Sequence, residues 1–412
     1  MRRPEDRHTE LDMLTAAFLA AEGVKQIAIA DTLAISQAAV SRLLAQARQT
    51  HLRQELRFLE DKVSPDVMEQ IRRRVSRRPR SDALNRISLH FAHVRGPSLR
   101  VFPCTAPAGD MPQRMTELSR LAARTIRELI LRCRCFGVTW GGMVSRVAAA
   151  MKELALPAPW VEDPIEVIPL SGEPLGDSPT TYSSSSIAHL LGQVLNGESY
   201  NARSLAMVPA FVPDRFEPEE IAGVWRLIGL VKSHAEIFGP HRDGAHPKGQ
   251  GAAEQGPIAG RVDMILTSVG PAERPLGFGK GTLFATGKVT IEDLRQLVLG
   301  DMGGVCFPKP TLTAKQAARL EAVAGRWTGL TKEHLVPCAQ RAFAQHSSSK
   351  GPPGVVVISV GRERAPFLLE AIKLGLINHL IIDDELQDEL ERIVKHDFPG
   401  FISESSPAAG RR

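Results

Sequence analysis

The chain has 412 residues, of which 51 are Lys or Arg and 46 are Asp or Glu, so its formal net charge is +5. That length allows two or three domains with a sizeable core. No apolar run is long enough to cross a bilayer, and the N-terminus lacks the apolar segment of a signal peptide, which argues against a membrane or secreted protein. The five scattered cysteines suit reduced thiols, and we expect a cytoplasmic protein without a membrane partner.

Residues 11–48 predict three short helices joined by turns. The first helix has apolar side chains at three- and four-residue spacing, which is the period of one helical face. A second helix is predicted at 25–33, and Ser36 is expected to cap a third. The side chains expected to face a shared core are Leu11, Leu14, Phe18, Leu19, Ile27, Ala28, Leu33, Ala39, Val40, Leu43 and Leu44.

The third predicted helix has a polar outer face, which suits the base edges and phosphates of a DNA major groove. Gln37 can pair bidentately with adenine, Arg42 can reach guanine or a phosphate oxygen, and Ser41 is expected to hold a phosphate. The alternative is a small helical module that only buries its apolar stripe. The residues predicted to contact double-stranded DNA are Lys25, Gln26, Ser36, Gln37, Ala38, Ser41 and Arg42.

Two features follow the predicted helices. Leu52, Leu56, Leu59 and Val63 fall at the spacing of a coiled-coil seam, which either pairs two subunits or packs as an ordinary helix on its own domain. Residues 71–80 contain six arginines and no acidic residue, so they either follow a phosphate backbone or form a solvated linker. We expect a homodimer or a homotetramer.

Beyond residue 82, short β-rich runs alternate with amphipathic helices, which predicts an α/β domain. Several runs are almost continuously apolar, as in parallel strands covered on both faces, so we predict a doubly wound sheet. Strands are expected at 99–104, 133–138, 165–170, 204–208, 262–269, 354–360 and 379–383. Helices are expected at 113–131, 144–154, 185–195, 218–231, 314–324, 364–374 and 385–394. The predicted units are a helix-turn-helix domain at 1–58, an Arg-rich helical linker at 59–81, the α/β domain at 82–403 and a disordered tail at 404–412.

The sequence offers two weak candidates for a metal site. Cys133 and Cys135 alternate along a predicted strand and would share one face, but no second pair has ligand spacing, which favours buried structural thiols. His241 and His246 lie in a Gly-, Pro- and His-rich stretch at 239–260, which is interpreted as a mobile loop. We therefore expect neither a metal nor a cofactor.

Glycine-rich turns after predicted strands mark the positions where an open α/β sheet binds its ligand. Gly141 and Gly142 follow one strand and can present amide hydrogens at the start of the next helix, which is an anion site in outline. Asp301 can accept hydrogen bonds from sugar hydroxyls. Arg362 or Arg364, at the start of a later helix, can hold a phosphate.

The order of these motifs resembles the SorC family of bacterial transcriptional regulators. That family has an N-terminal helix-turn-helix and a C-terminal sugar-binding domain related to ribose-phosphate isomerases and CoA transferases. The resemblance covers nearly the whole chain and rests on EGVKQIAIADTLAISQAAVSRLLAQAR, Thr139-Trp140-Gly141, GDMGG, VVVISVGRER and HLIIDDE. It implies an effector, a sugar or a sugar phosphate, that alters operator binding. The effector-binding residues that it implies are Trp140, Gly141, Gly142, Gly172, Asp301, Gly361, Arg364 and Asp383.

Three positions depart from the family pattern. Met143 stands where the family has Thr or Ser, and Val360 replaces the first glycine of a pair. Arg364 takes the place of a phosphate-facing lysine, which keeps the charge and adds a bidentate fork.

Two other functions are compatible with the sequence. One is an isomerase-like enzyme with Asp301 or Asp383 as general base, although such an enzyme has no use for the helices at 11–48. The other is a regulator whose α/β domain serves only for oligomerisation, which the departures at Met143 and Val360 favour.

Overall fold

The computed structural model describes most of the helical module and of the α/β domain. The described residues are 9–21, 24–50, 63–64, 67, 97–104, 106–107, 109–154, 163–174, 180–212, 217–239, 256–271, 290–345 and 351–397. Four sequence predictions lie outside these ranges wholly or for the most part: the seam, the Arg-rich run, the loop with its two histidines and the tail.

The N-terminal module consists of α1 (Glu10–Ala21), α2 (Gln26–Leu33) and α3 (Gln37–Thr50). The start of α1 is capped reciprocally, because the Thr9 N–H donates to the Asp12 carboxylate at 2.7 Å and the Asp12 N–H donates to the Thr9 hydroxyl at 3.2 Å. Ser36 caps α3 as predicted: its hydroxyl oxygen accepts from the Ala39 N–H at 3.2 Å. The axes of α2 and α3 are bent by 103°, within the range of about 90–120° that is typical of helix-turn-helix pairs.

The prediction that Ile27 faces the core is wrong. Its side chain is 64% exposed, whereas Ile29, Ala30 and Leu33 are buried. These three lie on one face at helical spacing, and a residue two positions before Ile29 lies on the opposite side of the helix. The other predicted core positions of the module are buried or partly buried.

The turn between α2 and α3 holds Ala34 at φ 54° and ψ 41°. This is the left-handed region, which costs an L-residue roughly 1–2 kcal/mol. We expect Ala34→Gly to raise the free energy of unfolding by about 0.5–1 kcal/mol, because part of that gain is lost to the greater chain entropy of glycine. Ala45→Gly, at an exposed position within α3, should lower it by about 1 kcal/mol. Urea unfolding measures both variants, and a destabilised Ala34→Gly protein would contradict this reading of the turn.

A six-stranded parallel sheet, in the order β1-β9-β8-β4-β2-β3, forms the centre of the α/β domain. Successive residues of β8 point to opposite faces of the sheet and pack into two separate hydrophobic cores. Val356 and Ile358 belong to the core on one face, and Val355 and Val357 belong to the core on the other. The strands are β1 (Ser98–Phe102), β2 (Cys135–Val138), β3 (Glu166–Pro169), β4 (Met264–Thr267), β8 (Gly354–Ser359) and β9 (His379–Asp383).

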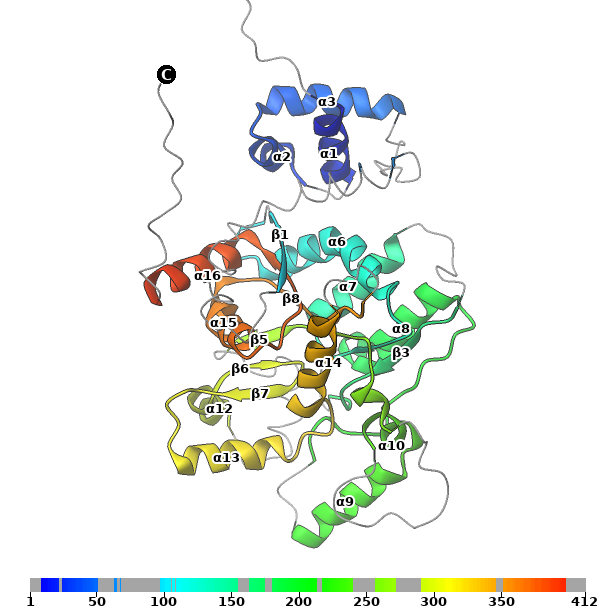
Figure 1. Ribbon diagram of the computed structural model, residues 1–412, viewed down its shortest axis with the longest axis vertical. Coiled ribbons are helices and arrows are strands. Elements are labelled where there is room, and N and C mark those ends of the chain that lie inside the picture. The colour runs from blue at the N-terminus through cyan, green and yellow to red at the C-terminus, as the bar shows by residue number, and fades with distance from the viewer. Residues whose placement is uncertain are drawn as a thin grey trace, which may run out of the picture.

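Helices cover both faces of this sheet, so the predicted doubly wound α/β fold is confirmed (Figure 1). One face is covered by α6 (Met111–Ile130), α7 (Gly142–Glu153) and α8 (Ser184–Asn196). The other is covered by α10 (Lys232–Phe238), α14 (Lys332–Ala344), α15 (Ala365–Lys373) and α16 (Asp384–Asp397). Among the described helices, none has by itself the length and hydropathy of a membrane span, and α2 with α3 reaches them only as a bent pair.

A second, antiparallel sheet of three strands was not predicted from the sequence. Its order is β5-β6-β7. The strands have only three to five residues, and Gly300 lies in the middle of β6. The sequence therefore has no alternation of polar and apolar residues from which these strands could be predicted. The elements of this region are β5 (Val269–Pro271), α12 (Ile291–Leu297), β6 (Val298–Met302), β7 (Val305–Pro308) and α13 (Ala314–Ala324). Single 3-10 turns lie at η2 (Thr180–Tyr182), η3 (Ile258–Gly260) and η5 (Arg362–Arg364).

The predicted strand at 204–208 is a turn. Leu205 and Val208 are fully buried, which explains the strand-like pattern. The Val208 N–H, however, donates to the Leu205 carbonyl at 2.8 Å and closes the turn locally. The Leu205 N–H donates to the hydroxyl of Ser185 at 2.9 Å rather than to a neighbouring strand.

Candidate functional site

A cavity of about 420 Å³ opens where β2, β4 and β8 end. The chain leaves each of these strands through a residue that lines it: Trp140 follows β2, Ser268 follows β4 and Val360 follows β8. This is the edge at which open α/β sheets bind ligands. The lining residues are Met111, Pro112, Met115, Trp140, Gly141, Gly142, Met143, Arg146, Pro174, Tyr182, Ser268, Val269, Gly270, Pro271, Asp301, Gly303, Ile358, Ser359, Val360 and Arg364.

The start of α7 provides backbone amides at one wall. Gly141 has φ +124°, a conformation that favours glycine, and its N–H is already donated to the Tyr182 carbonyl at 2.9 Å. Gly142 and Met143 form the first turn of α7 and line the cavity. Their amides belong to the first turn, whose N–H groups have no partner within the helix, so this wall suits an anionic or carbonyl oxygen.

Arg364 lines the cavity, but its guanidinium is already bonded to other groups of the protein. Its Nε donates to the Val269 carbonyl at 3.2 Å, and one Nη contacts the Val360 carbonyl and the Glu363 carboxylate. The side chain is 17% exposed. The guanidinium therefore holds the start of β5 against the end of β8, and the adjacent carboxylate offsets its charge.

Asp301 contributes a carboxylate to the lining of the cavity. It is 4% exposed and accepts from the Gly304 N–H at 3.1 Å. Burial, followed by the charge of Asp301, raises the pKa of Cys306, which therefore stays a neutral thiol. A buried carboxylate at a cavity wall is suited to accept hydrogen bonds from hydroxyl groups.

Ser359 lines the cavity from the end of β8 and is 2% exposed. Its Oγ has no hydrogen-bond partner among the described residues. Buried hydroxyls almost always have a partner, and an exception needs an explanation. A ligand hydroxyl or carboxylate in the cavity would supply one.

Asp383 does not line the cavity but belongs to a buried ion pair beside it. Its carboxylate, fully buried, contacts the guanidinium of Arg114 at 2.5 Å and accepts from the Gly361 N–H at 3.3 Å. Arg114 also donates to the Ala106 carbonyl at 2.7 Å. Burial opposes the charge on Arg114, yet the hydrogen bond and charge of Asp383 outweigh it and raise the pKa of the guanidinium. The pair joins α6 to the end of β9.

The structure thus brings together five of the eight predicted effector residues: Trp140, Gly141, Gly142, Asp301 and Arg364. Gly361 and Asp383 bond to each other outside the lining. Gly172 packs against the Pro209 carbonyl and Thr328, where an added Cβ would lie 2.7 and 2.6 Å from their oxygens. Four lining residues had no signal as ligand contacts in the sequence: Met111, Met115, Arg146 and Tyr182. Met111, Met115 and Tyr182 lie far from the predicted glycine turn in the chain, whereas Arg146 lies one helical turn after it in α7.

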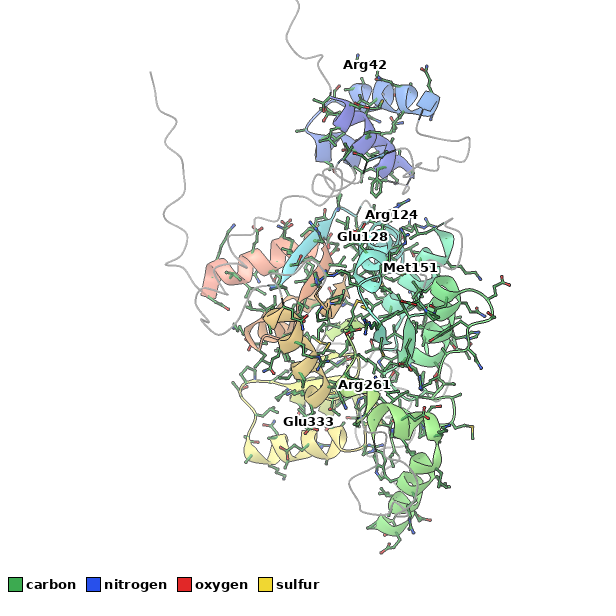
Figure 2. The ribbon with its side chains drawn as sticks, turned by 45° about the vertical axis from the view of Figure 1, so that its right-hand side comes forward. Arg42, Arg124, Glu128, Met151, Arg261 and Glu333 are labelled. Atoms are coloured by element: carbon green, nitrogen blue, oxygen red, sulfur yellow. The ribbon has the colours of Figure 1, made fainter. Side chains whose placement is uncertain are left out.

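The predicted DNA-contacting residues are accessible to solvent. Gln26 is partly exposed, and the other six are exposed, while the inward positions of α3 are buried. Figure 2 places Arg42 on the side of α3 that faces away from the α/β domain. A polar helix face is therefore presented to solvent at one end of the molecule.

Helix α6 connects the cavity to the helical module. Met111 and Met115 in its first turns line the cavity, and the guanidinium of Arg124, further along, lies 4.9 Å from the ring centroid of Phe18 in α1 (Figure 2). This is the distance of a cation–π contact. Burial, with the charge of Arg127, lowers the pKa of Arg124 to about 10, so the contact carries a desolvation cost.

The two neighbouring cysteines do not form the predicted common face. Cys133 precedes β2 and packs into the core on one side of the sheet, whereas Cys135 packs into the core on the other. Burial raises the pKa of Cys135 to about 12. Within the described ranges, no group of three or more His, Cys, Asp or Glu side chains is arranged to hold a metal.

Neither a family model nor a curated protein sequence matches the chain. Among solved structures, it is similar to the full-length sorbitol operon regulator SorC from Klebsiella pneumoniae, with 15% identity over 92% of this chain and 98% of that one and a TM-score of 0.46. It is also similar to a DeoR family transcriptional regulator from Listeria monocytogenes, with 17% identity over 75% and 98% of the two chains and a TM-score of 0.45. A transcriptional regulator from Streptococcus pneumoniae TIGR4 is similar as well, with 15% identity over 76% of this chain and 96% of that one and a TM-score of 0.45. Likeness at this level assigns no role to any residue of this chain.

Proposed function

We propose that this protein is a sequence-specific DNA-binding regulator whose operator affinity is controlled by a small molecule in the cavity. The observation that supports this most directly is the reach of α6, which lines the cavity with Met111 and Met115 and contacts α1 through Arg124. An occupant that displaces the first turns of α6 changes the position of the Arg124–Phe18 contact. A packed helix with two arrangements is a physical route for coupling two sites.

The proposed effector is a small sugar or sugar phosphate. Asp301 would accept hydrogen bonds from its hydroxyls, the Ser359 hydroxyl would donate or accept one more, and the first turn of α7 would receive an anionic group. Arg364 would act mainly as a support, since its guanidinium already holds two backbone carbonyls. The methionines and Trp140 would pack against the apolar face of the ligand.

The experiment that tests this function has two stages. Selection from a random pool of double-stranded DNA with the full-length protein should enrich an inverted repeat, because a single small module buries too little surface for tight specific binding. A thermal-shift screen of sugars and sugar phosphates should then find a ligand that raises the melting temperature and changes affinity for the enriched site. Failure to enrich any sequence would contradict sequence-specific DNA binding. A ligand that stabilises the protein without changing its DNA affinity would contradict control by a small molecule.

Ser359→Ala should weaken binding of that ligand about fivefold, the equivalent of roughly 1 kcal/mol for one hydrogen bond between neutral groups. Calorimetry measures the change. Thr116→Ala, on an exposed turn of α6 where the hydroxyl bonds only to the Pro112 carbonyl at 3.0 Å, is the matched control and should bind the ligand normally. Unchanged affinity in Ser359→Ala would mean that the ligand lies elsewhere in the cavity.

The Arg124 contact predicts how the two sites communicate. Arg124→Gln removes the cation from the face of Phe18, and we expect the ligand-induced change in DNA affinity to fall at least about fivefold, within the usual range of coupling energies of about 1–3 kcal/mol. Ligand affinity of the α/β domain should stay close to that of the unmodified protein. Arg120→Gln, on an exposed part of the same helix, should leave the coupling intact. Equal coupling in all three proteins would exclude this route.

A further inference from the structure

The two cationic side chains in the described lining of the cavity, Arg146 and Arg364, differ in what they already bind. Arg364 contacts the Glu363 carboxylate and donates to two backbone carbonyls. Arg146 makes one hydrogen bond, from Nη1 to the Gly142 carbonyl at 3.0 Å, and no carboxylate of the described residues lies within ion-pair distance of it. The charge of Arg146 and its other N–H groups are therefore available to a ligand.

The hydrogen bond to Gly142 places the guanidinium of Arg146 at the start of α7. Helical side chains lean toward the N-terminus, so Arg146 reaches back by one turn and ends beside the cavity. The amides of a first helical turn carry a partial positive charge, and a cation beside them is unfavourable. The first turn of α7 contains no acidic residue. An anionic group bound at this wall would interact favourably with both the guanidinium and the helix start.

Other hydrogen-bond donors lie beside the same wall. Ser268 follows β4, and its Oγ would lie 3.5 Å from a Cβ added at Gly141. The hydroxyl, the first-turn amides and the guanidinium are together suited to the oxygens of a carboxylate or a phosphate. Ser359 independently indicates a ligand, because its Oγ is buried and has no partner among the described residues.

The rest of the lining favours a ligand with one anionic group. Asp301 is the one acidic residue among the described residues of the lining, and it is buried. Its carboxylate would repel a second anionic group but accept hydrogen bonds from hydroxyls. Met111 and Met115 offer apolar contacts and no side-chain donor. The charge of Arg364 is already offset by Glu363, so it does not provide a second anion site.

We propose that Arg146 holds the anionic group of the effector and selects a sugar with one carboxylate or one phosphate over the neutral sugar. Both groups present two oxygens to the planar fork of a guanidinium. The hydroxyls of the sugar then face Asp301 and Ser359. That the bound molecule is an effector rests on the proposed function, whereas the binding of an anion by Arg146 does not.

Inorganic phosphate tests the anion site without knowledge of the sugar. At constant ionic strength, exchange of chloride for roughly 50 mM phosphate should raise the melting temperature of the full chain by specific binding. Phosphate also stabilises proteins in general by exclusion from their surface, so the readout is the difference in this gain between variants. Arg146→Gln should gain clearly less than the unmodified protein. Arg362→Gln, in which the replaced side chain is 64% exposed and outside the lining, should gain as much. Equal gains in all three proteins would overturn the proposal.

Calorimetry with matched sugars identifies the anionic group. The panel contains pentoses and hexoses, each as the neutral sugar, the sugar carboxylate, the monophosphate and the bisphosphate. The tightest ligand should be a carboxylate or a monophosphate, and Arg146→Gln should weaken its binding about ten- to a hundredfold, the usual cost of a lost charged hydrogen bond. Arg146→Lys should lose less, because it keeps the charge without the fork. A neutral sugar or a bisphosphate as the tightest ligand would overturn the proposal.

Gel-shift titration with the selected operator separates this proposal from the proposed function. If Arg146→Gln loses its share of the phosphate gain but no sugar of the panel changes operator affinity, the anion site is retained and control by a sugar is contradicted. If an anionic sugar binds the unmodified protein and Arg146→Gln equally well and changes the operator affinity of both, the regulator is retained and the role of Arg146 is overturned.

Discussion

Arg114→Met should lower the free energy of unfolding by about 3–5 kcal/mol, because it leaves the fully buried carboxylate of Asp383 without its cation. The same substitution removes the donor to the Ala106 carbonyl and the contact with Asp384 at 3.2 Å. The α/β domain is expected to lose this stability, because α6 would separate from the end of β9. Urea unfolding followed by tryptophan fluorescence measures the effect.

Two further variants separate the charge from the volume of these side chains. Arg120 lies on α6 like Arg114 and forms an exposed ion pair with Glu153 of α7 at 3.7 Å. Arg120→Met should therefore change the free energy of unfolding by less than about 1 kcal/mol. Arg114→Met combined with Asp383→Leu should recover most of the loss, since replacing both partners leaves no unpaired buried charge. A double variant as unstable as Arg114→Met alone would show that the loss comes from packing rather than from the unpaired carboxylate.

Combined substitution of Gln37, Ser41 and Arg42 by alanine should abolish sequence-specific DNA binding. These side chains lie on the exposed face of α3 and contribute nothing to its buried face, so the fold should be retained. Arg42→Ala alone should weaken operator binding by roughly 1–3 kcal/mol if the guanidinium reads a base, and the loss should be confined to sites that carry that base. Gel-shift titration with the selected operator and with a scrambled duplex separates specific from non-specific binding.

The matched control is Gln49→Ala, an exposed polar residue near the end of α3, which should bind the operator almost normally. The salt dependence of binding gives a second readout, because a lost phosphate contact reduces its slope by about one. An unchanged operator affinity in the triple variant would contradict DNA recognition through α3.

Local patterns in the sequence determined much of this protein. The inward positions of α3, the cap at Ser36 and the parallel strands near the C-terminus were predicted at or close to their observed bounds, because each depends on neighbours within a few residues. The doubly wound arrangement followed from continuous apolar strands that alternate with helices. Ile27 was misassigned because a short helix allows more than one choice of inward face.

What the tertiary structure decided is which residues meet. Asp301, Gly141 and Arg364 reach one cavity from different strand ends, while Asp383, predicted for the same site, is held by Arg114 more than two hundred residues away in the sequence. Met111 and Met115 reach that cavity only because α6 packs on one face of the sheet with its first turns beside the ends of the strands. Periodicity fixes the face of a helix but not the element on which that face packs. Long-range contacts such as the ion pair at β9 and the contact of Arg124 with Phe18 therefore appear only when the chain is folded.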